Sequence, residues 1–329
     1  MRLLGLFVYG ATLAVISHQI GAQPIKAFKD CELCPEMVAI PPGRVLVGMP
    51  RGMEEKFGIP AVNRKRSEPV TEVIIGYRFG VGRFEVTRGQ FAAFVQETKY
   101  SPVDSTGCWA GYGRPAVPVN NRRRAIGRPD VGYGLSWSDP GFAQTDDHPV
   151  VCVSLDDINK YLGWISQKAG RNYRLLSESE WNYVVGGGIK TAWPWGGDAA
   201  GACGYGNFSD LTRALAEGLD ITPDNEFQCF DGFVNTAPVG SFAPNKLGIY
   251  DLAGNVMEVL ADCFQDDLES LPRDGSPYVQ GNCALRSSKG GSWDSFPFAT
   301  LTGYRSIFDA RPGQRYTFAG FRLAVTLAP

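Results

Sequence analysis

The sequence predicts a single α+β domain that is rich in loops, has short regular elements, and is stapled by disulfides and bound cations. Three observations support this fold class. The 329-residue chain is 44% hydrophobic and 20% charged, which supplies enough apolar side chain for a sizeable core. Its 40 glycines and 22 prolines interrupt regular structure often, so helices and strands must be short. Long irregular segments need staples, and eight cysteines and several oxygen-rich loops can supply them.

The N-terminus is typical of an export signal. Arg2 precedes an uncharged, mostly apolar run from Leu3 to Ile16, and Gly21-Ala22 supplies small residues at a cleavage point. The run is shorter than the roughly 20 residues that a membrane span needs, so a signal peptide over residues 1–22 is favoured over an uncleaved anchor. We expect a secreted or periplasmic protein without membrane attachment after cleavage.

The charge pattern does not indicate nucleic-acid binding. The formal net charge is −2, which gives no electrostatic footprint for a polyanion. The densest basic cluster, Arg122 to Arg124, lies between Asn121 and Gly127, and a solvated loop explains it better than a binding patch. We expect no nucleic-acid partner, while the oligomeric state stays open.

All eight cysteines lie beyond the predicted signal, so disulfides are expected rather than metal ligands. The preferred pairs are Cys203–Cys229 and Cys263–Cys283, because each flanks a segment that carries a motif described below. Cys31 and Cys34 have the spacing of a redox or zinc element, but a structural disulfide is favoured because no second such pair accompanies them. The sequence leaves the pairing of four cysteines open, namely Cys31, Cys34, Cys108 and Cys152.

Short strands are expected at both ends of the domain. The run from Met37 to Gly43 opens the folded part, and Arg44 to Met49 alternates like a strand. Two further short apolar runs lie between Val73 and Phe84, where glycines interrupt them. Near the C-terminus, residues 318–327 alternate as a final strand.

Three helices are predicted from their caps and apolar spacing. The first begins after Thr87 as N-cap, and the second begins after Ser154 and stops at Gly170. The third begins with a capping box, in which Ser177 and Glu180 satisfy each other's backbone donors, and ends at the glycines 186–188. This structural role of Glu180 makes a catalytic role unnecessary.

Blocks of sequence from residue 35 to the C-terminus agree, in order, with those of one known family. The blocks are Cys34–Met49, Glu85–Phe91, His148–Ser154, Arg174–Trp181, Asp251–Glu258, Gly290–Trp293 and Gly320–Arg322. This order resembles the sulfatase-modifying-factor family, whose best-known member is the formylglycine-generating enzyme (FGE). The resemblance implies a single α+β domain over residues 35–329, related to C-type lectin folds and stapled by calcium, after a lead-in over residues 23–34.

The family binds an ion with the block from Asp251 to Glu258. Asp251 and Glu258 offer carboxylates, while Gly254 and Val256, two residues apart, can turn their carbonyls inward. Calcium prefers such mixtures of carboxylate and carbonyl oxygens. The resemblance therefore implies a first structural Ca²⁺ site here. The alternative is an N-capping Asp251 and an exposed Glu258.

A second structural Ca²⁺ site follows from the same resemblance. It combines Asn207 and the Phe208 carbonyl with Asp231 and the Phe233 carbonyl. A long loop separates the two halves, and the predicted Cys203–Cys229 disulfide would bring its ends together. The alternative is an Asp-Gly turn at Asp231 with nothing bound.

The family's catalytic thiols are missing. Members that oxidise a sulfatase cysteine hold copper(I) with two cysteines after the Gly-Gly-Ser block, and those positions are Ser295 and Thr300 here. Hydroxyls are poor ligands for this soft ion, so we expect the copper mechanism to be absent. Met257, which replaces a pocket tryptophan of the family, agrees with this. The sequence does not identify any other redox metal.

A candidate cleft remains if the fold is that of the family. Its residues are Ser292, Trp293, Ser295, Phe296, Thr300, Tyr304 and Arg305, with Arg311 and Arg315 nearby. Aromatic and arginine side chains suit a peptide or an anionic small molecule. Equally, the aromatics could fill the core while the arginines pair with Asp294 or Asp309. His148, which leads into a strand, is not expected to act as a general base.

Two function classes follow. The first is an exported FGE-like protein that oxidises a peptide or small molecule without the two-cysteine copper centre, as the resemblance implies for a branch that oxidises a siderophore chromophore in the periplasm. The alternative is a non-catalytic accessory or binding module on the same scaffold that assists a periplasmic enzyme. A true sulfatase-activating enzyme is disfavoured by the missing thiols. The sequence does not identify the substrate.

Overall fold

The computed structural model describes residues 27–102, 107–110, 130–132, 135–186, 191–219, 221–281 and 283–328. The predicted signal peptide over residues 1–22 and the basic cluster from Arg122 to Arg124 lie outside these residues. None of the described helices is both long and apolar enough to cross a lipid bilayer.

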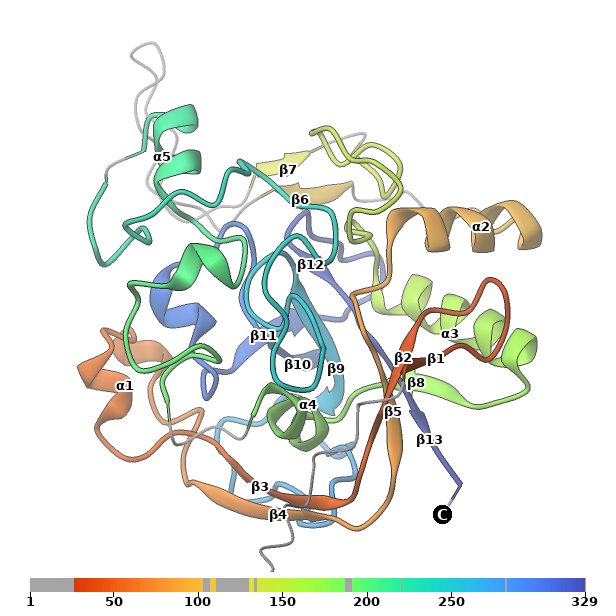
Figure 1. Cartoon of the computed structure of the whole chain (residues 1–329), viewed down its shortest axis with the longest axis horizontal. Coiled ribbons are helices and arrows are strands. Elements are labelled where there is room, and N and C mark those ends of the chain that lie inside the picture. The colour runs from red at the N-terminus through yellow and green to blue at the C-terminus, as the bar shows by residue number, and fades with distance from the viewer. Residues whose placement is uncertain are drawn as a thin grey trace, which may run out of the picture.

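Two sheets form the centre of the molecule (Figure 1). A five-stranded antiparallel sheet has the order β1 (Ala27–Phe28), β2 (Met37–Ile40), β5 (Phe79–Gly82), β13 (Leu323–Thr326) and β8 (Tyr173–Leu175). A four-stranded sheet has the order β11 (Ser306–Asp309), β10 (Leu285–Lys289), β9 (Met257–Cys263) and β12 (Ala319–Gly320). Two hairpins, β3 (Gly43–Val47) with β4 (Thr71–Ile75) and β6 (Cys108–Ala110) with β7 (Asp130–Gly132), complete the described strands. The first and last described strands thus belong to one sheet.

The three predicted helices are confirmed. They are α2 (Arg88–Thr98), α3 (Leu155–Ala169) and α4 (Glu178–Val185), and capping boxes at Thr87, Ser154 and Ser177 begin them. The short elements α1 (Met53–Lys56), η1 (Ala61–Asn63), η2 (Ala202–Gly204), α5 (Leu211–Glu217) and η3 (Pro297–Thr300) were not predicted. Each spans seven residues or fewer, which is too short for a clear apolar period.

The predicted final strand is divided in two. Between β12 and β13 the chain turns away at Phe321 and Arg322, where the Phe321 carbonyl accepts a hydrogen bond from the Val86 amide at 2.9 Å. The Arg322 guanidinium lies 2.7 Å from Glu258 in the neighbouring sheet. The break between β12 and β13 therefore lets the Arg322 side chain reach a carboxylate of the four-stranded sheet.

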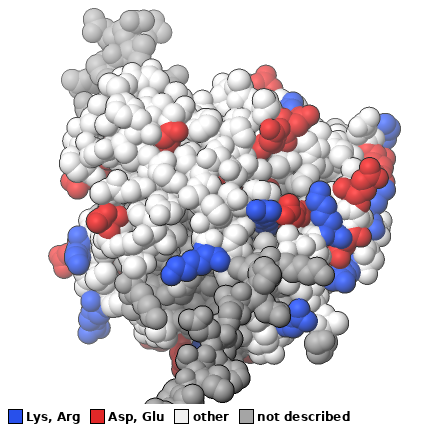
Figure 2. Space-filling view, viewed as in Figure 1, with Lys and Arg blue, Asp and Glu red and all other residues white. Residues whose placement is uncertain are grey.

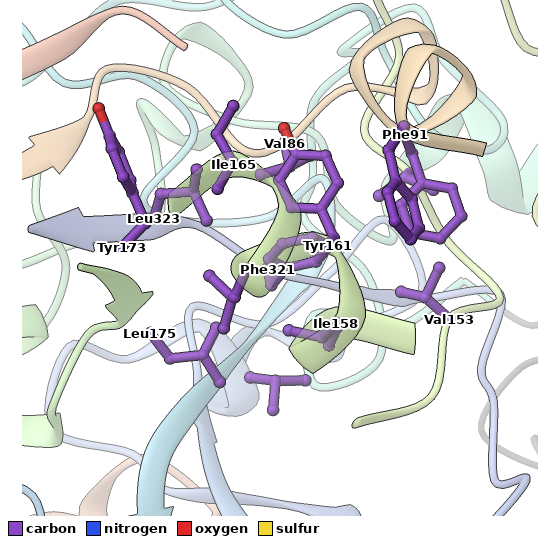
Figure 3. Close-up of a cluster of buried hydrophobic side chains, with 14 of the residues drawn as sticks. Val86, Phe91, Val153, Ile158, Tyr161, Ile165, Tyr173, Leu175, Phe321 and Leu323 are labelled. Atoms are coloured by element: carbon purple, nitrogen blue, oxygen red, sulfur yellow. The ribbon is translucent and has the colours of Figure 1, made fainter. Parts of the chain in front are cut away.

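The largest hydrophobic cluster packs α2 and α3 against the five-stranded sheet (Figure 3). Tyr161 lies at its centre, with its ring 6.0 Å from that of Phe91 and 5.5 Å from that of Phe321. A second cluster packs α4 between the β3–β4 hairpin and β9, through Trp181 and Leu260 among others. Aromatic packing of this kind contributes about 1 kcal/mol per pair beyond burial.

Four disulfides use all eight cysteines. The two pairs predicted from the sequence, Cys203–Cys229 and Cys263–Cys283, are present. The disulfide favoured for the Cys31 and Cys34 spacing is also present, and the two cysteines that remain pair as Cys108–Cys152. On the face shown in Figure 2, acidic and basic side chains are interspersed over a mostly uncharged surface.

Candidate functional site

The side chains of Ser295 and Thr300 lie next to each other, beside Gly291. A Cβ added to Gly291 would meet the Thr300 Cγ2 at 2.7 Å and the Ser295 Cβ at 3.2 Å. Gly291 also has a φ of +70°, a conformation that favours glycine. We call Ser295 and Thr300 the hydroxyl pair, and both residues are buried.

Neighbouring groups already satisfy the hydroxyl pair. The Ser295 Oγ accepts a hydrogen bond from the Ser292 amide at 2.9 Å and lies 3.1 Å from the Ser292 Oγ. The Thr300 Oγ1, presented by η3, accepts a hydrogen bond from the Trp193 Nε1 at 3.0 Å and donates one to the Pro297 carbonyl at 2.8 Å. Both hydroxyls are therefore held by hydrogen bonds to neighbouring protein groups.

A buried ion pair that sequence reasoning missed lies beside these hydroxyls. Arg213 of α5 pairs with the fully buried Asp294. The guanidinium carbon of Arg213 lies 4.8 Å from the centre of a Trp293 ring, and the Trp293 Nε1 donates to the Thr317 carbonyl at 3.1 Å. Trp293 is thus fixed in orientation from two sides.

The arginines of the predicted cleft form ion pairs. Arg305 is fully buried and its Nε donates to Glu178 at 2.8 Å, so it does not line an open cleft wall. Arg315 pairs with Asp157 at 2.9 Å, and the exposed Arg311 pairs with Asp309. The arginines thus form ion pairs, which is the alternative to a cleft that the sequence analysis gives. Of the two partners named there, Asp309 pairs with Arg311, whereas Asp294 pairs with Arg213.

The first predicted ion site is a buried loop, residues 251–258, which we call the Asp251 loop. One carboxylate oxygen of Asp251 accepts a hydrogen bond from the Gly240 amide at 2.7 Å. The other is buried and has no hydrogen-bond partner among the described residues. Asp251 lines a small cavity of about 40 Å³, and burial raises its pKa to about 6. An unpartnered buried carboxylate oxygen is costly unless a cation or water compensates it.

Glu258, the second predicted carboxylate ligand, is already engaged. Its Oε1 accepts hydrogen bonds from Arg322 at 2.7 and 2.8 Å, and its Oε2 accepts one from the Trp181 Nε1 at 3.0 Å. Gly254 and Val256 lie in the same buried loop. Glu258 is therefore the ion-pair partner of Arg322. In the Asp251 loop, the carboxylate oxygen without a hydrogen-bond partner among the described residues belongs to Asp251.

Glu85 is a third carboxylate at this loop, and sequence reasoning missed it. It is fully buried, and it accepts hydrogen bonds from the Asn255 Nδ2 at 2.7 Å and from the Val256 amide at 3.2 Å. Burial, together with the neighbouring Asp251, raises the pKa of Glu85 well above its usual value. Three carboxylates thus share one buried guanidinium, that of Arg322, and a bound cation would reduce the excess negative charge.

Residues of the second predicted ion site lie close together. Asp231 accepts hydrogen bonds from the amides of Phe208 and Phe233, both at 2.8 Å. The Asn207 Oδ1 is buried and has no hydrogen-bond partner among the described residues. Burial raises the pKa of Asp231 to about 7, and the adjacent Asp210 contributes to this shift. This group, the Asn207–Asp231 site, therefore fits a cation.

Within the described residues, no three His, Cys, Asp or Glu side chains are arranged as a ready metal site. An ion at either place would therefore depend largely on amide and carbonyl oxygens, which calcium accepts and softer metals do not. The two places are adjacent, because the Asn255 amide donates to the Asn207 carbonyl at 2.8 Å.

Comparison with known proteins places the chain in a family. Residues 24–327 match the model of the sulfatase-modifying factor enzyme 1-like domain. The chain belongs to this family. It is 30% identical over 293 residues to the formylglycine-generating enzyme of Thermomonospora curvata, covering 80% of this chain and 84% of that protein.

Solved structures agree with the family. PvdO from Pseudomonas aeruginosa superposes with a TM-score of 0.65 at 28% identity, over 93% of this chain and 100% of that chain. Treponema denticola variable protein 1 has a TM-score of 0.60 at 18% identity, over 92% of this chain and 99% of that chain, and shares the fold.

Sequence identity alone does not separate active from inactive relatives. The chain is also 30% identical over 245 residues to the inactive Cα-formylglycine-generating enzyme 2 of Mus musculus, covering 70% of each chain. Proteins named as active and as inactive therefore match at the same level. The activity of this chain has to be argued from its site residues.

Proposed function

We propose that this chain is an exported FGE-family protein that oxidises a peptide or a small molecule without the two-cysteine copper centre. The family match supports the oxidising role, and the cysteine pairing is the observation that carries the absence of the copper centre. All eight cysteines lie in disulfides, and the resemblance puts Ser295 and Thr300 at the two positions of the family's thiol pair. Copper(I) prefers thiolate ligands, and none is left to bind it.

Export is supported by the same disulfides. Disulfides form and persist in oxidising compartments, and the chain has four. The apolar run near the N-terminus supports cleavage of a signal peptide near Ala22. The mature protein would then act in the periplasm or outside the cell.

Two structural calcium ions are part of the proposal. The first would be held at the Asp251 loop by Asp251 and the Gly254 and Val256 carbonyls, with Glu258 and Glu85 as neighbouring carboxylates. The second would be held by Asn207, Asp231 and the carbonyls of Phe208 and Phe233. The unpartnered oxygens of Asp251 and Asn207 support both sites. Calcium would contribute binding energy to the folded state and no redox chemistry.

A second function has its own support. The hydroxyls of Ser292, Ser295 and Thr300 are buried and bonded to neighbouring protein groups. This arrangement favours a non-catalytic accessory module, since an active site normally keeps a group free to meet its substrate.

Oxygen consumption by the mature chain separates these functions. The protein, produced from residue 23 with calcium, is mixed with copper or iron and with either a sulfatase-derived cysteine peptide or a siderophore chromophore precursor. We expect no formylglycine from the cysteine peptide. We expect oxygen uptake with the siderophore chromophore precursor. Formylglycine formation would contradict the proposal. Ligand binding without oxygen uptake under any metal would favour the accessory module.

A further inference from the structure

A charged hollow of about 550 Å³ lies on the surface away from the residues considered above. Four cationic and four anionic residues line it, together with Val62 and Pro69: Arg51, Arg64, Lys65, Arg66, Glu68, Asp266, Asp267 and Glu269. The cations come from the segment that contains α1 and η1. Three of the carboxylates come from the loop after β9. Two segments far apart in sequence therefore form its walls.

Buried groups hold both walls in place from behind. The Arg305 Nη1 donates to the Arg66 carbonyl at 2.5 Å and to the Gln265 and Asp267 carbonyls at 2.9 and 3.3 Å. The two walls are also joined directly, since the Leu268 amide donates to the Glu68 carbonyl at 2.7 Å. Arg305, expected in a cleft, thus organises the backbone of this hollow.

The basic wall has its own buried support. Glu54 is 3% exposed, and its carboxylate accepts hydrogen bonds from the amides of Lys65 at 2.5 Å and Ser67 at 3.4 Å. Lys65 is held with a φ of +73°, which is uncommon for a residue with a side chain. The Arg66 guanidinium lies 5.5 Å from the centre of the Phe264 ring, which orients it.

The opposite charges in the hollow do not form ion pairs with one another. None of these eight described side chains forms an ion pair with another of them, and Arg64 instead pairs with Glu55 outside the hollow at 3.5 Å. The two walls therefore place cations and carboxylates in the same cavity without direct ion pairs between them. Charges held in this way are available to a ligand that bridges them.

We propose that the charged hollow binds a short peptide that carries both acidic and basic side chains. A ligand with a single sign of charge would meet repulsion from half of the lining, whereas a mixed-charge ligand can face an opposite charge on each wall. The volume lies within the range of small-ligand pockets, roughly 300–1,000 Å³, and accommodates a few residues. This proposal does not depend on oxidation at the hydroxyl pair.

Binding of three labelled peptides to the mature chain tests the proposal by fluorescence anisotropy at low salt. All have blocked ends and equal length, one alternating Lys and Glu, one all Lys and one all Glu. We expect the alternating peptide to bind about tenfold more tightly than either other peptide, because single-sign peptides meet like charges. Equal or tighter binding of the all-Glu or all-Lys peptide would overturn the proposal, as would undetectable binding of the alternating peptide.

Charge-reversal variants locate the binding. Arg51→Glu and Asp266→Lys change exposed side chains on opposite walls, so the fold is retained. Each should weaken the alternating peptide about threefold, since each replaces an attraction at a partly solvated site by a repulsion. Lys246→Glu, an exposed change outside the hollow, is the matched control and should leave affinity unchanged. Equal affinities for all three variants would place binding elsewhere.

Discussion

Because Gly291 has no side chain, Ser295 and Thr300 can both pack against it. Ser295 and Thr300 both approach the Gly291 Cα, and their hydroxyls bond to Ser292, Trp193 and the Pro297 carbonyl. Oxygen is a hard ligand, and copper(I) prefers sulfur. The residues that meet here therefore decide the chemistry, while the backbone that brings them together is that of the family.

Gly291→Ala tests the close approach at this position. The added methyl group would lie 2.7 Å from the Thr300 Cγ2 at a φ of +70°, so we expect a loss of about 2 kcal/mol or more in the free energy of unfolding. Urea unfolding measures it. Gly163→Ala is the control, because this exposed helical glycine has open space around it and should gain about 0.5–1 kcal/mol. Equal effects would contradict the packing described at Gly291.

At the scale of elements, the segments of the two proposed calcium sites contact each other directly. The Asn255 amide donates to the Asn207 carbonyl, and a Cβ on Gly254 would lie 2.2 Å from that carbonyl oxygen. The Cys203–Cys229 disulfide closes the loop that carries Asn207 at one end and leads to Asp231 at the other. Loss of order in one segment should therefore weaken both sites.

Removal of the Cys203–Cys229 disulfide, as Cys203→Ser with Cys229→Ser, tests this expectation. We expect a loss of about 3 kcal/mol in unfolding free energy, since the bond spans 26 positions. Calcium affinity, measured by isothermal titration calorimetry, should fall with it. The matched control removes Cys31–Cys34, which spans 3 positions and should cost about half as much without changing calcium affinity. A calcium affinity unchanged by the first variant would argue against the coupling.

At the scale of the whole molecule, buried ion pairs connect elements that are distant in the chain. Arg322 bonds to Glu258 across the two sheets, and Arg213 joins α5 to the segment after β10. Arg305 joins α4 to the segments before β4 and after β9. Removing one partner of such a pair leaves a buried charge uncompensated, at a cost of about 3–5 kcal/mol. These pairs explain how a loop-rich chain holds one arrangement.

The parts predictable from sequence were those with local signals. Thr87, Ser154 and Ser177 begin helices because their side chains bond backbone amides three residues on, which a short window reveals. Glu85 could not be found in this way, because its partner Val256 lies 171 residues away. The resemblance to the family places Arg305 in a cleft, and its actual partner Glu178 could not be inferred because it lies 127 residues away.

Stability should depend on pH and calcium together. Burial raises the pKa of Asp231 to about 7 and that of Asp251 to about 6, from ordinary values near 3.8. Between about pH 4 and 7 the folded state then holds more protons than the unfolded state, so unfolding free energy falls as pH rises.

Without calcium we expect a loss on the order of 5 kcal/mol between pH 4.5 and 7.5, and calcium should restore much of it at the higher pH. Thermal unfolding in chelator and in excess calcium at both pH values measures this. Magnesium serves as the control ion, since it fits flexible carbonyl-rich sites poorly. Calcium stabilisation as large at pH 4.5 as at pH 7.5 would contradict the assignment of these carboxylates to the ion sites.

Copper(I) titration of the mature chain and of the Ser295→Cys, Thr300→Cys variant tests the central claim most directly. Both side chains adjoin Gly291, so two cysteines there would place their sulfurs close enough to share one ion. The account predicts no tight copper(I) binding by the natural chain and one equivalent bound by the double variant with its two new thiols free and its four native disulfides intact, measured by competition with a chromogenic chelator. One equivalent bound by the natural chain, or none by the variant, would contradict it.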